Sequence, residues 1–131
     1  LAGRSEGFIG GRADLDETGR RLRAYAAAGA DVLYAPGLRS AEQIAAVVAA
    51  VAPRPVNVLV AGDGPTVGDL AALGVRRVSL GSTLARVAFS AFARSAEEIL
   101  RTGRFGSFAG LMSYAELDRF FREDLERRGG R

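Results

Sequence analysis

The sequence contains no histidine, cysteine or lysine, so all 18 basic residues among its 131 are arginines. A Ser-His-Asp triad, a thiolate nucleophile, a Schiff-base lysine, a Walker-type phosphate loop and a Cys/His zinc site each need a residue type that is missing. Binding or catalysis by this chain must therefore use carboxylates, arginine, tyrosine, serine, threonine, asparagine and backbone amides.

Long apolar runs are also absent. No run approaches the ~20 residues that cross a bilayer, and the N-terminal segment lacks the basic-then-apolar layout of a secretion signal. The net charge is +3 and the pI about 10.1, but 15 acidic residues are interleaved with the arginines. We therefore expect a cytoplasmic protein that binds neither membranes nor nucleic acid.

Helical and strand patterns alternate along the chain, with glycines at the joints, which is typical of an α/β fold with a parallel sheet. Residues 3–8 take the place of a first strand in this repeat. The expected later strands are residues 31–34, 56–61 and 77–80, and the expected helices are residues 14–28, 40–51, 66–73, 83–100 and a final one from residue 113.

Four such strand-helix units do not close a barrel, because an eight-stranded (β/α)8 barrel takes roughly 250 residues. An open doubly wound sheet, a half-barrel that pairs with another half, and a fragment of a longer chain all remain possible, although no Gly-x-Gly-x-x-Gly follows the first strand. Because the chain opens on Leu1 and on a strand, we expect a missing preceding segment. We predict a half-barrel over residues 1–102, followed by a linker and a C-terminal helix over residues 103–131.

Candidate site residues are those beyond the carboxyl ends of the strands, where parallel sheets bind ligands. Arg4 lies in a segment expected to be buried, so its guanidinium should meet either an anionic ligand or the nearby Glu6. Asn57 interrupts an apolar strand, and its amide should either tie strands together or contact substrate. Arg86 lies one turn into a helix and is expected on the side of the strand ends.

Two glycine-containing loops follow the third and fourth strands. Residues 62–65 and 81–83 stand where many barrels bind phosphate, if these are the last two strands of a barrel. Ser82 or Thr83 could equally serve as an ordinary helix N-cap. In the tail, Leu117, Phe120, Phe121 and Leu125 form an apolar stripe, which is typical of a core or a subunit interface.

Several segments together resemble the second half of enzymes in the isocitrate lyase and phosphoenolpyruvate mutase superfamily. These are Gly-Arg-Ser-Glu-Gly-Phe at residues 3–8, Ala-Gly-Ala-Asp-Val-Leu-Tyr at 28–34, Pro-Val-Asn-Val-Leu at 55–59, Leu-Gly-Val-Arg-Arg-Val-Ser at 73–79 and Leu-Ala-Arg at 84–86. The resemblance runs from Leu1 to about Leu117. It implies the C-terminal half of a (β/α)8 TIM barrel and a magnesium-dependent enzyme that cleaves or rearranges C–C or P–C bonds of small 2-hydroxy or 2-oxo acids.

The resemblance also implies residue roles. Arg4 would hold a substrate carboxylate or phosphonate, and Asn57 and Arg86 would belong to the same anion-binding shell. Glu6, Tyr34 and Tyr114 are further candidates. Pro36 stands where lyases of the family carry a glutamate, which disfavours a methylisocitrate-type reaction.

The family's metal-binding carboxylates lie on the first half of the barrel, so we expect Mg²⁺ to bind residues outside this sequence and no metal ligand set within it. Glu6 and Asp63, with waters, would be the only local alternative. The expected partners are a small carboxylate or phosphonate substrate and further copies of the same chain, bound through the C-terminal helix.

Two other functions stay open from the residues themselves. One is a degenerate or scaffolding half-barrel that serves association without catalysis. The other is a phosphate-binding barrel of another superfamily that uses the loops at Gly62 and Gly81. If the leading interpretation is right, the chain alone is inactive.

Overall fold

A computed structural model describes residues 1–129 of the chain. Contacts between residues divide it into two compact units, Leu1–Arg86 and Val87–Arg131. The boundary lies within a helix and differs from the one expected at residue 102. The assignment of residues 1–102 and 103–131 as separate domains stays a prediction.

The first unit is built on a parallel sheet whose four strands lie in chain order, β1-β2-β3-β4. The strands are β1 (Ala2–Arg4), β2 (Val32–Tyr34), β3 (Val56–Leu59) and β4 (Arg77–Ser79). The helices between them are α1 (Leu15–Ala27), α2 (Ala41–Val51) and α3 (Val67–Ala72). This confirms the α/β class with a parallel sheet; β3 ends two residues earlier than expected.

The helix boundaries follow local capping chemistry. Asp14 accepts a hydrogen bond from the Glu17 amide at the start of α1, and Ser40 and Gln43 form a capping box at the start of α2. These caps satisfy amides that have no partner inside the helix. Gly29, which follows the last residues of α1, has a φ of +99°, a backbone conformation that residues other than glycine rarely adopt.

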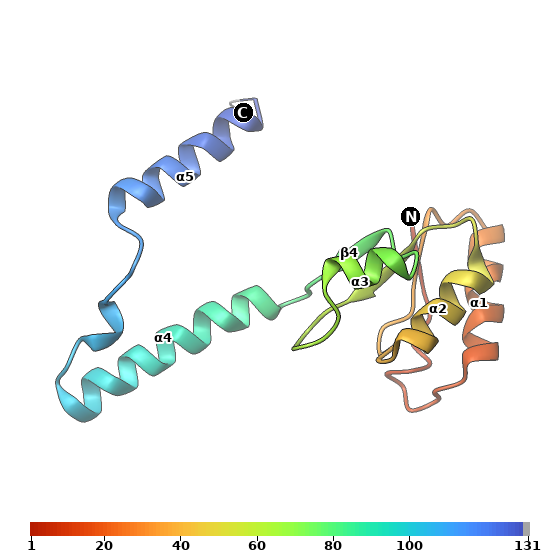
Figure 1. Ribbon diagram of the computed structural model, residues 1–131, viewed down its shortest axis with the longest axis horizontal. Coiled ribbons are helices and arrows are strands. Elements are labelled where there is room, and N and C mark those ends of the chain that lie inside the picture. Colours follow the sequence, from red (N-terminus) through yellow and green to blue (C-terminus); the bar gives the residue numbers. More distant parts are fainter. Residues whose placement is uncertain (130–131) are drawn as a thin grey trace. The chain divides into compact units, whose positions relative to one another are not determined.

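The core lies between the sheet and the helices α1 and α2, which pack against each other and against β1, β2 and β3 (Figure 1). Its most buried side chains are Leu22, Leu33, Leu70, Val47 and Val56. A Cβ on Gly3 would approach the Cβ of Tyr25 on α1 to 2.8 Å, so β1 lies too close to α1 for any larger residue. Gly3 therefore faces α1, and its neighbour Arg4 faces away from it.

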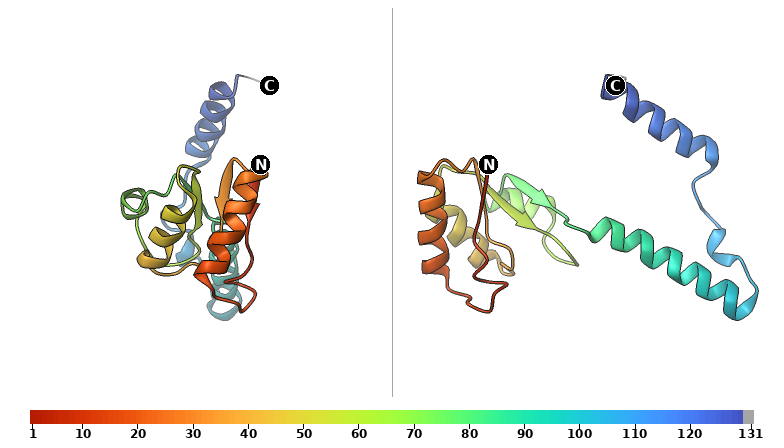
Figure 2. Two further views of the ribbon diagram at one scale, coloured as in Figure 1. Left: turned by 90° about the vertical axis from the view of Figure 1, so that its right-hand side faces the viewer. Right: turned by 180° about the vertical axis from the view of Figure 1, so that it is seen from behind.

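The second unit contains most of α4 (Thr83–Thr102), a 3₁₀ turn (Gly106–Phe108) and α5 (Tyr114–Arg127), which Figure 2 follows along the chain. Glu98 accepts hydrogen bonds from the amides of Gly106 and Ser107 at 3.1 and 3.0 Å and so ties the turn to α4. These bonds, the Ser107 contact above all, lower the pKa of Glu98. No helix within residues 1–129 is long and apolar enough to span a bilayer.

Candidate functional site

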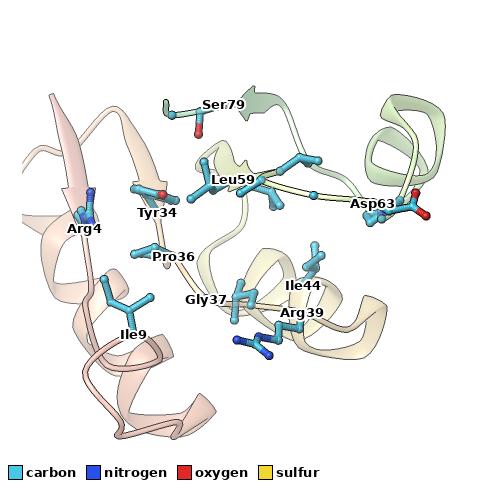
Figure 3. A pocket seen from close by; sticks show the side chains of 18 residues that line it. Arg4, Ile9, Tyr34, Pro36, Gly37, Arg39, Ile44, Leu59, Asp63 and Ser79 are labelled. Carbon is cyan, nitrogen blue, oxygen red and sulfur yellow. The ribbon is translucent and has the colours of Figure 1, made fainter. Parts of the chain in front are cut away.

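A cleft of about 920 Å³ opens at the carboxyl ends of the strands (Figure 3). Parallel pairing brings these ends to one edge of the sheet, which is where ligands bind in parallel α/β folds. Arg4, Tyr34, Leu59 and Ser79 reach it from the ends of the four strands. The rest of the wall is formed by the loops that follow, namely Ile9, Pro36, Gly37, Leu38, Arg39, Ile44, Val58, Val60, Ala61, Gly62, Asp63, Gly64, Pro65 and Gly81.

Arg4 is the charged residue of the cleft lining that belongs to a strand. Its Nε atom forms an ion pair with Glu6, and its Cζ atom lies 5.1 Å from the centre of the Tyr34 ring. The side chain is 48% exposed, so the arginine is not buried as its place in the repeat suggested. The internal pair with Glu6, one of the two alternatives for Arg4, is present in the structure.

The strand register explains why Arg4 and Tyr34 meet. Arg4 pairs with Tyr34, Tyr34 with Asn57, and Asn57 with Arg77. Residues paired in this way point to the same face of a sheet. The four side chains therefore form one row across the face that turns away from α1, with arginines at both of its ends.

Asn57 is buried, with 2% of its surface exposed. Its Nδ2 atom donates a hydrogen bond to Ser79 Oγ at 2.9 Å and so joins β3 to β4. Its Oδ1 atom is buried and accepts no hydrogen bond from any part of the chain that the structure describes. Buried polar atoms are nearly always paired, so this oxygen lacks an expected donor among residues 1–129, and Asn57 itself does not line the cleft.

Ser79 was not singled out as a site residue in the sequence. It lies in the same strand pattern as Val78, and alternation along a strand places it on the face of Asn57. The buried amide of Asn57 indicates that a hydrogen-bond partner is needed. The sequence does not show which residue of the next strand lies within its reach.

Arg86 lies outside the cleft of the first unit, and Tyr114 belongs to the second unit. Arg86 is exposed in the first turn of α4, where its amide bonds to the Ser82 carbonyl, and it does not line the cleft. Tyr114 is 90% exposed at the start of α5, in the second unit. Their roles in substrate binding stay predictions.

Acidic residues are sparse around the cleft. Asp63 lines it, and Glu6 is engaged by Arg4. Across residues 1–129, no three acidic side chains lie close enough together to hold a metal ion. Mg²⁺ usually keeps several waters beside one or two carboxylates, and among the described residues Asp63 is the carboxylate that lines this cleft, with Glu6 already paired to Arg4.

A smaller cavity of about 320 Å³ lies beside the start of α1. It is lined by Ser5, Thr18 and Arg21 among others, and the Ser5 hydroxyl is buried there without a partner among the described residues. Hydrogen bonds from Arg21 and then from Arg20 lower the pKa of the neighbouring Glu17. Arg20 and Arg21 are therefore both engaged by the internal carboxylate of Glu17.

The parallel sheet with helices between its strands and a cleft at its carboxyl edge defines an α/β fold of the barrel or open-sheet type. Residues 1–100 match the sequence profile of the phosphoenolpyruvate phosphomutase family, and the chain belongs to that family. This confirms the resemblance expected from the sequence.

Solved structures give the same result. A candidate lyase/mutase from Burkholderia cenocepacia J2315 is 48% identical over 93% of this chain, with a TM-score of 0.86. Oxaloacetate acetylhydrolase in complex with the product oxalate is 28% identical over 99% of the chain, with a TM-score of 0.78. 2,3-Dimethylmalate lyase, a member of the PEP mutase/isocitrate lyase superfamily, shares the fold at 23% identity over 96% of the chain, with a TM-score of 0.71.

The chain spans less than half the length of these structures, namely 44%, 46% and 47%. No curated protein matches the sequence. Family membership is therefore shown for this chain, whereas the activity of a complete enzyme is a matter for proposal.

The pairing of Asn57 with Ser79 leads to a first prediction. Ser79→Ala should remove the acceptor of the Asn57 amide and leave a buried N–H unpaired, at a cost of about 1–3 kcal/mol in the free energy of unfolding. Chemical denaturation of the full-length protein measures this. Ser90→Ala, at an exposed serine within α4, should change stability by less than about 0.5 kcal/mol. Equal effects of the two substitutions would contradict the structural role of the pair.

Proposed function

We propose that this chain is the C-terminal half of a (β/α)8-barrel lyase or mutase that cleaves or rearranges a C–C or P–C bond of a small 2-hydroxy or 2-oxo acid in the cytoplasm. The observation that carries the proposal is the position of Arg4. It places a cation at the carboxyl edge of the sheet in a chain that belongs to the phosphoenolpyruvate phosphomutase family.

Arg4 suits the binding of an anionic substrate group. A guanidinium presents a planar fork of N–H donors that matches a carboxylate or phosphonate with two parallel hydrogen bonds. Glu6 pairs with Nε, and the Nη atoms are the donors that we assign to the ligand. In this role Arg4 fixes the acid end of the substrate, and the reacting bond is thereby placed relative to the rest of the site.

Asn57 adds a polar contact of a different kind. With Nδ2 bonded to Ser79, its Oδ1 atom is an acceptor and suits a ligand hydroxyl or another N–H or O–H donor. We place Arg86 in the same shell, because it lies in the first turn of the helix that follows β4. Positive groups around the reacting carbons stabilise the negative charge that develops as an enolate-like species forms.

The remainder of the enzyme would lie outside this chain. β1 and β4 are the two edges of the sheet, and edge strands present unpaired backbone groups that further strands can satisfy. The coverage of less than half of each related structure supports this division. Since the described residues offer no metal ligand set, we assign the Mg²⁺ ligands to the other half, and the ion would supply stabilisation of substrate oxygens there.

The structures of relatives indicate the scale of the substrate. One relative is solved with oxalate, and another is named for 2,3-dimethylmalate, both small dicarboxylic acids. Charged groups in the cleft of this chain are confined to Arg4, Arg39 and Asp63 among its described residues. A small carboxylate or phosphonate is consistent with this lining.

We propose further that α5 joins copies of the protein. Leu117, Phe120, Phe121 and Leu125 are 40–62% exposed on this helix, and Phe120 and Phe121 stack edge to face at 5.4 Å. When another surface covers apolar side chains of this size, their removal from water lowers the free energy of the protein. A second copy of the same chain is the occupant we assign to this stripe.

The association is tested by placing charge in the stripe. Phe120→Asp combined with Phe121→Asp should dissociate the full-length oligomer, because two carboxylates would have to be buried. Light scattering coupled to size exclusion measures the mass. Arg122→Asp on the same helix is the matched control and should keep the wild-type mass. A wild-type monomer, or an oligomer that survives the double substitution, would contradict the assignment.

The enzymatic proposal is tested with the full-length protein and a panel of 2-hydroxy and 2-oxo acids that includes oxaloacetate, with and without Mg²⁺. We expect Mg²⁺-dependent bond cleavage or rearrangement. Arg4→Ala should lower kcat/KM by roughly 10- to 150-fold, the equivalent of the 1.5–3 kcal/mol typical of a hydrogen bond to a charged group.

Arg54→Ala is the matched control, because Arg54 is an exposed arginine in the turn before β3. This turn lies at the amino ends of the strands, away from the cleft. Its kcat/KM should equal that of the wild type. The isolated 131-residue chain should show neither turnover nor calorimetric binding of Mg²⁺. Turnover by that isolated chain, or full activity in Arg4→Ala, would overturn the proposal.

A further inference from the structure

Tyr34 lies beside Arg4 in the cleft, at the end of the neighbouring strand (Figure 3). The two residues are register partners in the β1-β2 ladder, and the Ser5 amide donates a hydrogen bond to the Tyr34 carbonyl at 2.9 Å. The backbone thus fixes the base of the tyrosine directly opposite the base of the arginine. The ring is half-buried and lies with its centre 5.1 Å from the guanidinium carbon.

The guanidinium of Arg4 is held at two places. The Tyr34 ring contacts it through a cation-π interaction, and Glu6 pairs with its Nε atom. The ion pair is formed through Nε, and among residues 1–129 Glu6 is the one carboxylate paired with this arginine. A long side chain restrained in this way loses less conformational freedom when an anion binds, which strengthens binding without a new contact to the ligand.

From this geometry we propose that Tyr34 is a positioning residue that holds Arg4 in the orientation that receives the substrate's anionic group. The inference rests on the proposed function, because it assumes that Arg4 binds that group. It assigns the contribution of Tyr34 to its aromatic face. The phenolic hydroxyl is dispensable.

This assignment makes a specific demand on the tyrosine position. Phenylalanine or tryptophan preserves an aromatic face beside the guanidinium, whereas isoleucine keeps apolar bulk and strand propensity but has no ring. A purely structural role in the strand would be met by isoleucine as well as by phenylalanine. The positioning role therefore predicts weaker binding with isoleucine than with phenylalanine, whereas a purely structural role predicts equal binding with both.

The test uses the full-length protein and oxalate as the anionic probe, with Mg²⁺ present, and measures the dissociation constant by calorimetry. Tyr34→Ile should weaken oxalate binding roughly 3- to 30-fold, the range of a partly desolvated cation-π contact. Tyr34→Phe and Tyr34→Trp should bind within about twofold of the wild type. Tyr25→Ile, at a half-buried tyrosine of α1, is the matched control and should leave the affinity unchanged.

A double-mutant cycle shows whether Tyr34 acts through Arg4. In an Arg4→Ala background, Tyr34→Ile should cause no further loss of affinity. An equal loss in both backgrounds would overturn the positioning role, and so would wild-type affinity in folded Tyr34→Ile. If Tyr34→Ile does not fold, as judged by thermal melting, Tyr34→Leu takes its place, and weakened binding in Tyr34→Phe would equally contradict the assignment.

The cycle also separates this inference from the proposed function. If Arg4→Ala binds oxalate as tightly as the wild type, Arg4 is not the anion site, and the proposed function is refuted. Arg4→Ala that weakens binding while Tyr34→Ile does not would leave the anion site intact and refute the positioning role alone.

Discussion

The parallel hydrogen-bonded ladder is the constraint on which the candidate site depends. Because β1 to β4 run in the same direction and in chain order, every strand ends at the same edge. The register then sets Arg4, Tyr34, Asn57 and Arg77 in one row on the face opposite α1. A shift of one residue in any strand would turn its member of this row toward the helices, so the packing of the core and the composition of the cleft are specified together.

The two faces of the sheet carry different chemistry for the same reason. Leu33 and Val56 are buried in the core, and Gly3 allows β1 to approach α1 closely. The alternate residues carry charge and hydrogen-bonding groups, which are costly to bury unless they are paired. Here the pairing is partial: Arg4 is held by Glu6 and Tyr34, and Asn57 by Ser79, while Asn57 Oδ1 accepts no bond within the described residues.

Local signals in the sequence predicted the elements well. The Ser40 capping box and the Pro53–Pro55 turn place α2 and β3 correctly, because caps and proline act over a few residues. Arg4 and Asn57 stand out as polar residues in strands. Ser79 and the contact of Tyr34 with Arg4 could not be derived, because both depend on the register between strands far apart in sequence. The roles of Arg86 and Tyr114 in substrate binding stay predictions.

The central claim is that the carboxyl edge around Arg4 receives the anionic group of a small acid. A crystal structure of the full-length protein with Mg²⁺ and oxalate tests it most directly. We expect an oxalate oxygen within hydrogen-bonding distance of the Arg4 Nη atoms, with the Tyr34 ring still beside the guanidinium. Oxalate bound elsewhere, with Arg4 still engaged only by Glu6, would contradict it.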